Sequence, residues 1–182
     1  MKKNLLPLLT FSMLLTLGIL FGTLPALAQN PLKEYKAGHV FYLSLPDYMG
    51  KTTGLNSAAI IQYKNQVKDI YGFVIEDNKE ELALADLHYS SLNEFYDSFI
   101  KGFLKDEEKR TVSPAKYSAK GNIKFAEADA SHYDKETEME IYWLVGIVET
   151  KDAFYKVLSW SSLDQKDQFK ADFQKILYSL RD

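Results

Sequence analysis

The chain has 182 residues, of which 46% are hydrophobic and 14% aromatic, and it contains no cysteine. The lack of cysteine excludes disulfides, thiolate metal sites, cysteine nucleophiles and lipid attachment at a lipoprotein-type cysteine. The net charge is −3 and no polybasic run occurs, so nucleic acid and anionic lipid are poor candidates as partners.

The first 28 residues have the pattern of a secretory signal peptide. Lys2 and Lys3 precede an apolar run at 5–24, and Ala26 and Ala28 supply the small residues that a signal peptidase reads. We expect cleavage after Ala28, which leaves 29–182 as one domain with 20 basic and 25 acidic residues, a charge of −5. The alternative is a retained anchor, because the run is nearly long enough to span a bilayer. Cleavage predicts an exported protein, periplasmic or extracellular, with no stable membrane anchor.

Short alternating apolar segments in the first part of this domain predict β-strands at 39–45, 58–63 and 70–75. Pro46 ends the first of them, because proline cannot donate to a central ladder. The remaining segments are more polar. We interpret 30–36 as a polar lead-in, 49–57 as a loop and 76–81 as a charged turn, and 82–87 fits either a fourth strand or part of a long loop.

An amphipathic helix is predicted at 91–105. Ser91 stands three residues before Glu94, which is the spacing of a helix N-cap. Seven large apolar side chains then recur at helical period: Leu92, Phe95, Tyr96, Phe99, Ile100, Phe103 and Leu104. The charged run at 105–110 is expected to be a solvated loop.

Four further strands are predicted at 115–119, 123–133, 141–148 and 153–160. In 123–133 the small residues Ala126, Ala128 and Ala130 share one face, which indicates a helix lying close against it. The strand at 141–148 is apolar on both faces, so it must be covered on both and belongs in the centre of a sheet. The polar residues between 148 and 153 predict a hairpin to the next strand.

The last element is a second amphipathic helix that begins with a cap at Ser162. Its apolar stripe is Phe169, Phe173, Ile176, Leu177 and Leu180. Hairpin spacings and two helices together predict an α+β domain. We expect an antiparallel sheet of about six or seven strands, with one amphipathic helix packed on each face as an α-β-α sandwich.

This order of elements resembles the PsbP-like fold family. The likeness rests on the first strand ending in Leu45-Pro46, the helix after the third strand, and the closing strand pair and helix that ends in 176–180. The run at 71–81 is also similar to uncharacterised exported proteins of Bacteroidetes-type bacteria. The resemblance implies an α-β-α sandwich and a non-enzymatic role, and it supplies no functional residue.

No catalytic motif stands out in the sequence. His39, His88 and His132, with a carboxylate, are the only histidines that could gather into a metal or hydrolase site, but their spacing matches no known motif. Nucleophile elbows and phosphate-binding loops are absent. Paired acids such as those at 76–77 and 80–81 lie in polar turns, where solvated charge is the ordinary explanation, and a calcium site at 77–80 is the alternative. We therefore expect no catalytic residue, no metal and no cofactor, and a protein that is not an enzyme.

Two kinds of binding function remain open. The first is an interaction module for another envelope protein, whose contacts would include tyrosines at the ends of elements: Tyr35, Tyr48, Tyr117 and Tyr133. The second is a carrier of a small apolar ligand, held in a pocket between the sheet and the helix at 91–105. The sequence does not name the partner, the ligand or the oligomeric state.

Overall fold

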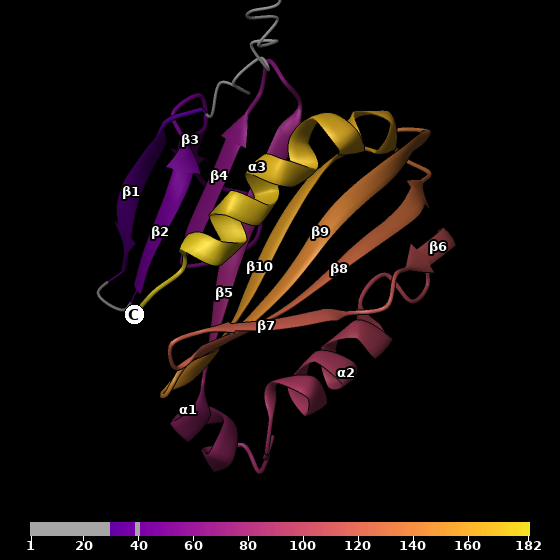
Figure 1. Ribbon diagram of the computed structural model, residues 1–182. Coiled ribbons are helices and arrows are strands. Elements are labelled where there is room, and N and C mark those ends of the chain that lie inside the picture. Colours follow the sequence, from indigo (N-terminus) through magenta and orange to yellow (C-terminus); the bar gives the residue numbers. More distant parts are fainter. Residues whose placement is uncertain (1–29, 39–40) are drawn as a thin grey trace, which may run out of the picture.

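The computed structural model describes residues 30–38 and 41–182, in which strands of two antiparallel sheets are joined by three α-helices (Figure 1). The strands are β1 (Leu32–Ala37), β2 (Phe41–Pro46), β3 (Gly50–Thr52), β4 (Ile61–Asn65), β5 (Ile70–Asn78), β6 (Glu108–Val112), β7 (Lys116–Lys120), β8 (Ile123–Asp134), β9 (Met139–Glu149) and β10 (Ala153–Ser162). The helices are α1 (Lys79–Leu84), α2 (Leu92–Gly102) and α3 (Lys166–Ser179).

The large sheet has eight strands in the order β3-β4-β5-β10-β9-β8-β6, with β7 also paired to β8. The small sheet consists of β1 and β2, which pair without a register shift from Leu32↔Pro46 to Ala37↔Phe41. An isolated bridge between Tyr42 and Arg181 ties β2 to the end of the chain. The small sheet and α3 lie on the same side of the large sheet in Figure 1.

The core on the α3 side joins the large sheet, the small sheet and the helix. Phe173, Ile176 and Leu177 of α3 are fully buried, and Phe169 and Leu180 are 3% and 2% exposed. They pack in one cluster with β2 and with Tyr142, Leu144 and Val148 of β9. The predicted apolar stripe of the last helix is confirmed.

The core on the opposite face lies under α2. Leu92, Phe95 and Tyr96 pack there with the three alanines of β8 and with Val145 and Ile147 of β9. The close approach expected from the alanine face is confirmed, and so is the burial of both faces of β9. The α-β-α arrangement follows, with the small sheet as an addition beside α3.

The number of strands is larger than predicted, because the outer strands carry almost no apolar signal. The expected lead-in at 30–36 is mostly β1, the expected loop at 49–57 contains β3, and the expected solvated run at 105–110 enters β6. An edge strand is bonded on one side only and needs no apolar face, and natural edges are often short and charged. Periodicity therefore misses them.

Two helix starts also differ from expectation. The segment at 82–87, predicted as strand or loop, belongs in part to α1, whose first turn is capped by the Asn78 side chain through the N–H groups of Glu80 and Glu81. Ser162 makes no capping hydrogen bond; a 3₁₀ turn (Leu163–Gln165) follows it, and α3 begins only at Lys166. The Ser91 cap on α2 is confirmed, because its Oγ accepts from the Glu94 N–H at 3.3 Å.

Within the described residues, no helix is both long and apolar enough to cross a membrane. The signal peptide expected at 1–28 lies outside the described residues. So does Gln29, the first residue of the expected mature chain.

Glu149 joins α2 to the end of β9. Its Oε1 lies 3.1 Å from Lys79 Nζ and its Oε2 lies 3.1 Å from Lys124 Nζ. Oε2 also accepts the backbone N–H of Leu92 at 3.1 Å, at the start of α2, where a negative charge is favoured by the helix dipole. Burial would raise the pKa of Glu149, but the two lysines outweigh burial and hold the pKa below its ordinary value.

Replacing Glu149 with glutamine should lower the free energy of unfolding by about 2 kcal/mol at pH 7, the scale of hydrogen bonds to a charged group. The folded-state pKa is depressed, so this contribution is fully present above the unfolded-state value of about 4.3 and is lost as the pH falls through the folded-state pKa. Urea unfolding of both proteins at pH 7 and at low pH measures it. A difference that does not shrink in acid would contradict the assignment.

Candidate binding site

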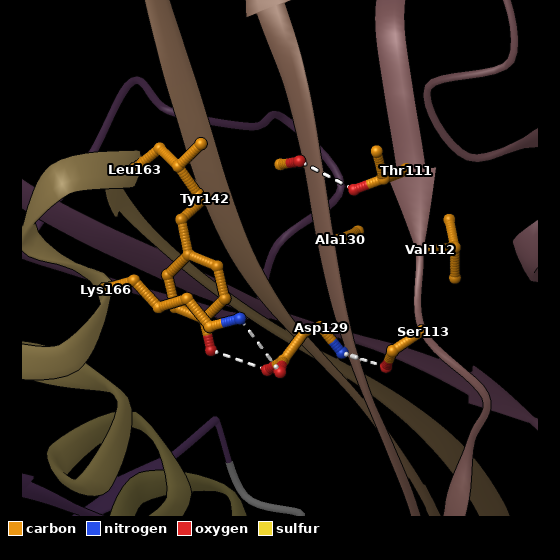
Figure 2. A pocket seen from close by; sticks show the side chains of 9 residues that line it. Thr111, Val112, Ser113, Asp129, Ala130, Tyr142, Leu163 and Lys166 are labelled. Carbon is orange, nitrogen blue, oxygen red and sulfur yellow. Dashed lines mark hydrogen bonds and ion pairs between the residues drawn. The ribbon is translucent and has the colours of Figure 1, made fainter.

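A pocket of about 270 Å³ opens between β6, β8, β9 and the start of α3 (Figure 2). We call it the Asp129 pocket. It is lined by Thr111, Val112, Ser113, Asp129, Ala130, Ser131, Tyr142, Leu163 and Lys166. Four of these nine residues carry a hydroxyl group and two carry a charge, and Thr111 at the rim is exposed.

Asp129 is at the centre of the polar contacts in this pocket. Its Oδ1 accepts the Tyr142 hydroxyl at 2.8 Å. Its Oδ2 lies 2.6 Å from Lys170 Nζ and 3.2 Å from Lys166 Nζ. The register places this carboxylate there, because alternate residues of β8 face α3 and the two lysines lie one turn apart on the helix.

The backbone of Asp129 is bonded at the point where β6 ends. The Ser113 N–H donates to the Asp129 carbonyl at 2.8 Å, and the Asp129 N–H donates to Ser113 Oγ at 3.0 Å. Beside it, the hydroxyls of Thr111 and Ser131 are 2.7 Å apart. The wall formed by β6 is therefore held to β8 by both backbone and side-chain bonds.

The pKa values of Asp129 and Tyr142 are shifted in opposite directions. Burial would raise the pKa of Asp129, but hydrogen bonds from Lys170, Tyr142 and Lys166 outweigh it, and the pKa lies below its ordinary value. Burial raises the pKa of Tyr142, and the hydrogen bond to Asp129 raises it further. At neutral pH the site consists of an ionised carboxylate and a protonated phenol.

A second carboxylate continues the polar contacts along α3. Glu127 is 3% exposed and accepts Gln174 Nε2 and the Tyr178 hydroxyl, each at 2.8 Å. Together with Lys166 and Lys170, these helix residues recur every fourth position and face β8. We call this set (Lys166, Lys170, Gln174 and Tyr178 with Asp129 and Glu127) the α3–β8 polar row. It fixes the helix against the sheet, and the Asp129 pocket opens at its lysine end.

The predicted contact residues Tyr35 and Tyr48 lie on the side of the small sheet. The Tyr35 ring, on β1, has Lys33 Nζ at 5.3 Å and Lys51 Nζ at 5.0 Å from its centroid. The Tyr48 hydroxyl donates to Asp172 of α3 at 2.5 Å. Tyr48 therefore attaches the segment between β2 and β3 to the helix.

The other two predicted tyrosines lie elsewhere. Tyr117 of β7 is 46% exposed, and its ring meets that of Tyr96 edge-on at 6.2 Å. Tyr133 of β8 lies under Lys109, whose Nζ is 4.9 Å from the ring centroid. The structure does not bring the four tyrosines together, and a role of each in partner contact stays a prediction.

The histidines do not gather in the described part of the chain. His88, between α1 and α2, lies 3.5 Å from Asp86. His132 is buried near the start of β9, where its Nδ1 accepts from Trp143 Nε1 at 3.3 Å. His39 lies outside the described residues, and residues 30–38 and 41–182 contain no group of three or more potential metal ligands of the histidine, cysteine or carboxylate type.

The space between α2 and the sheet, which was the predicted carrier pocket, is occupied by side chains. The rings of Phe95 and Phe154 stack there with centroids 4.3 Å apart and planes 6° from parallel. A second pocket, of about 480 Å³, lies instead at the other end of the large sheet, beside Ala37 and Lys51. This packing favours a filled interface over a carrier site.

Sequence reasoning missed the residues of the Asp129 pocket. One signal was available, because Glu127, Asp129 and Ser131 put polar groups on one face of a strand whose other face carries three alanines at the same level. A buried carboxylate row needs donors, and Lys166 and Lys170 at helical spacing could supply them. Their meeting across 41 positions, however, is visible only in the fold.

Comparisons with solved structures identify the fold. The solution structure of cyanobacterial PsbP (CyanoP) from Synechocystis sp. PCC 6803 is similar with a TM-score of 0.59 at 13% identity, covering 88% of this chain and 98% of that one. The crystal structure of LpqN from Mycobacterium tuberculosis is similar with a TM-score of 0.54 at 12% identity, covering 83% and 91%. No family model and no curated protein matches the sequence. The protein has a PsbP-like fold, as the resemblance implied.

Proposed function

We propose that the protein is an exported, non-enzymatic binding module of the cell envelope, and that it contacts a partner protein through the Asp129 pocket. The observation that carries the proposal is the form of this pocket. Its volume of about 270 Å³ is below the roughly 300–1,000 Å³ typical of small-molecule sites. An open hollow of this size, with charged, hydroxyl and apolar groups in its lining, suits one or two side chains of a partner.

The chemistry of the pocket supports binding over catalysis. Acid–base catalysis at neutral pH works best with a group whose pKa lies near 7. The pKa of Asp129 is lowered and that of Tyr142 is raised, so near pH 7 neither group changes its protonation state. Fixed donors and acceptors on rigid elements are suited to recognition.

The export part of the proposal is supported by the signal peptide pattern at 1–28 and by one structural neighbour. LpqN is described as involved in cell envelope biogenesis. The shared fold alone does not transfer that role. It adds to an N-terminal pattern that points to the same compartment.

Photo-crosslinking tests the proposed surface. A benzophenone side chain at Thr111, on the rim of the pocket, should give a discrete adduct with an envelope protein in intact cells. The same group at Val67, which is 98% exposed in the turn between β4 and β5, should give none. The adduct from Thr111 should fall about tenfold in Lys166→Gln, because one charged donor of the pocket is lost.

Lys151→Gln is the matched control, because it removes the same charge from an exposed hairpin away from the pocket. Thermal melting of both variants checks that they fold. Equal adducts from Thr111 and Val67, or an adduct that Lys166→Gln and Lys151→Gln reduce alike, would overturn the pocket as the contact surface.

A further inference from the structure

The charges of the chain are distributed unevenly. Residues 30–68, which form β1 to β4, carry five lysines against two acidic residues, a net charge of +3. Residues 69–182 carry 15 lysines and arginines against 23 acidic residues, a net charge of −8. An acidic protein therefore has one basic end, formed by the small sheet and the first strands of the large one.

Two unpaired strand edges lie at this basic end. Within the described residues, neither β1 nor β3 has a strand on its outer side. The second pocket opens between them, with Ala37 on one side, and Lys51 to Thr53 and Ile60 to Gln62 on the other. β1 is the longer edge, and its unbroken pairing with β2 leaves six residues in regular extended form.

Lys33 and Lys51 both contact the ring of Tyr35 at this edge. Lys33 pairs with Leu45 of β2, and Tyr35 pairs with Leu43. Side chains of paired residues lie on the same face of a sheet, so Lys33 and Tyr35 lie on the face whose leucines belong to the core. Both lysines are exposed, and their ammonium groups lie about the Tyr35 ring at 5.3 and 5.0 Å. The ion pairs of the described residues do not include either lysine, whereas Arg181 nearby is paired with Glu34.

We propose that the free edge of β1 binds an extended acidic segment of a partner polypeptide as an added strand. The backbone of the segment would pair with residues Leu32–Ala37. Because side chains alternate across a strand, every second residue of the segment would lie on the Tyr35 face. Carboxylates at those positions would meet Lys33 and Lys51. The pocket at Ala37 and Ile60 would take a small apolar side chain.

A different reason for lysines on an edge strand is protection, because they discourage the addition of a second copy. The two roles make opposite demands on the same side chains. Neutral residues at Lys33 and Lys51 would promote self-association if the lysines only protect. They would weaken the binding of an acidic strand if the lysines recognise it.

The experiment uses the exported chain and a short labelled peptide that alternates glutamate with valine. Fluorescence anisotropy should show binding that weakens with salt, and amide NMR shifts should concentrate on Leu32–Ala37. In Lys33→Gln/Lys51→Gln the affinity should fall about tenfold. It should be unchanged in Lys120→Gln/Lys151→Gln, which removes two exposed lysines elsewhere.

Two further probes separate strand addition from simple charge attraction. A peptide with an N-methylated backbone keeps its carboxylates but loses the backbone N–H groups that pair with β1. It should therefore not bind. Vesicles containing phosphatidylglycerol should bind far more weakly than the peptide. The proposal is overturned if the peptide does not bind, or if the N-methylated peptide or the vesicles bind as strongly as the peptide does. It is also overturned if the Lys33→Gln/Lys51→Gln variant self-associates while its affinity for the peptide is unchanged. The result is independent of the Asp129 pocket, which lies at the other edge of the large sheet.

Discussion

Replacing Phe173 with aspartate is expected to unfold the protein. Phe173 is fully buried in the middle of α3, with its ring 6.4 Å from that of Tyr142 and 6.3 Å from that of Phe169. Removing a buried phenylalanine side chain costs about 3–5 kcal/mol. An unpaired buried carboxylate adds several more, and a domain has only about 5–15 kcal/mol in total.

Ala171→Asp is the matched control, because it places the same charge on the exposed side of the same helix. Circular dichroism melts and size-exclusion chromatography of the two variants measure the difference. We expect a cooperative transition for Ala171→Asp and none for Phe173→Asp. A soluble Phe173→Asp protein with a cooperative melt would show that α3 does not hold the core together.

Replacing Gly146 with alanine is expected to cost about 3 kcal/mol. Gly146 lies in the middle of β9, where α3 crosses the sheet. A Cβ atom there would lie 2.3 Å from Cδ1 and 2.9 Å from Cδ2 of Leu177. Leu177 is fully buried in the core cluster on the α3 side, so the added methyl group overpacks the core.

Combination with Leu177→Ala tests this contact. Leu177→Ala alone should cost about 3 kcal/mol through the cavity that it leaves. The double variant should lose clearly less than the sum, because the methyl group at 146 enters that cavity. Gly102→Ala is the control, since nothing lies within 4 Å of a Cβ there. Urea unfolding of all four variants gives the values, and strict additivity would contradict the proposed contact.

The central part of this fold is predictable from sequence because its side chains are apolar on defined faces. β9 was placed correctly because an apolar strand needs cover on both sides, and α3 because five apolar residues share one stripe. The outer strands were not predicted because their side chains have no apolar face. β1 and β6 are held by backbone pairing to one neighbour, which leaves almost no trace in side-chain pattern.

The two misplaced helix starts show the limit of local signals. Asn78 and Glu81 have the spacing of a cap, and α1 does begin there, but the charges around them suggested a turn. Ser162 and Gln165 have a similar spacing, yet β10 continues through Ser162 because its backbone pairs with Ile141 of β9. Sheet pairing overrides a capping preference of about 1 kcal/mol.

The Asp129 pocket was not predictable because its members come from four elements. Asp129 takes its contacts from Ser113, Tyr142, Lys166 and Lys170, which only the sheet register and the crossing of α3 bring together. Sequence could mark Asp129 as an unusual residue on a buried strand. It could not say which donors would meet it.

The partner strand of β8 is interrupted: β6 pairs with its last part and β7 with its first, and residues 113–115 bridge the gap. Ala115 packs against the core cluster under α2, whereas the side chains of Ser113 and Pro114 belong to neither cluster. A change of chain length at 113–114 would therefore reshape the wall of the Asp129 pocket, because the two hydrogen bonds between Ser113 and the Asp129 backbone hold that wall in place. β6 and β7 each have their own pairing with β8, so the loop between them shapes the pocket while the order of the strands is set on either side of it.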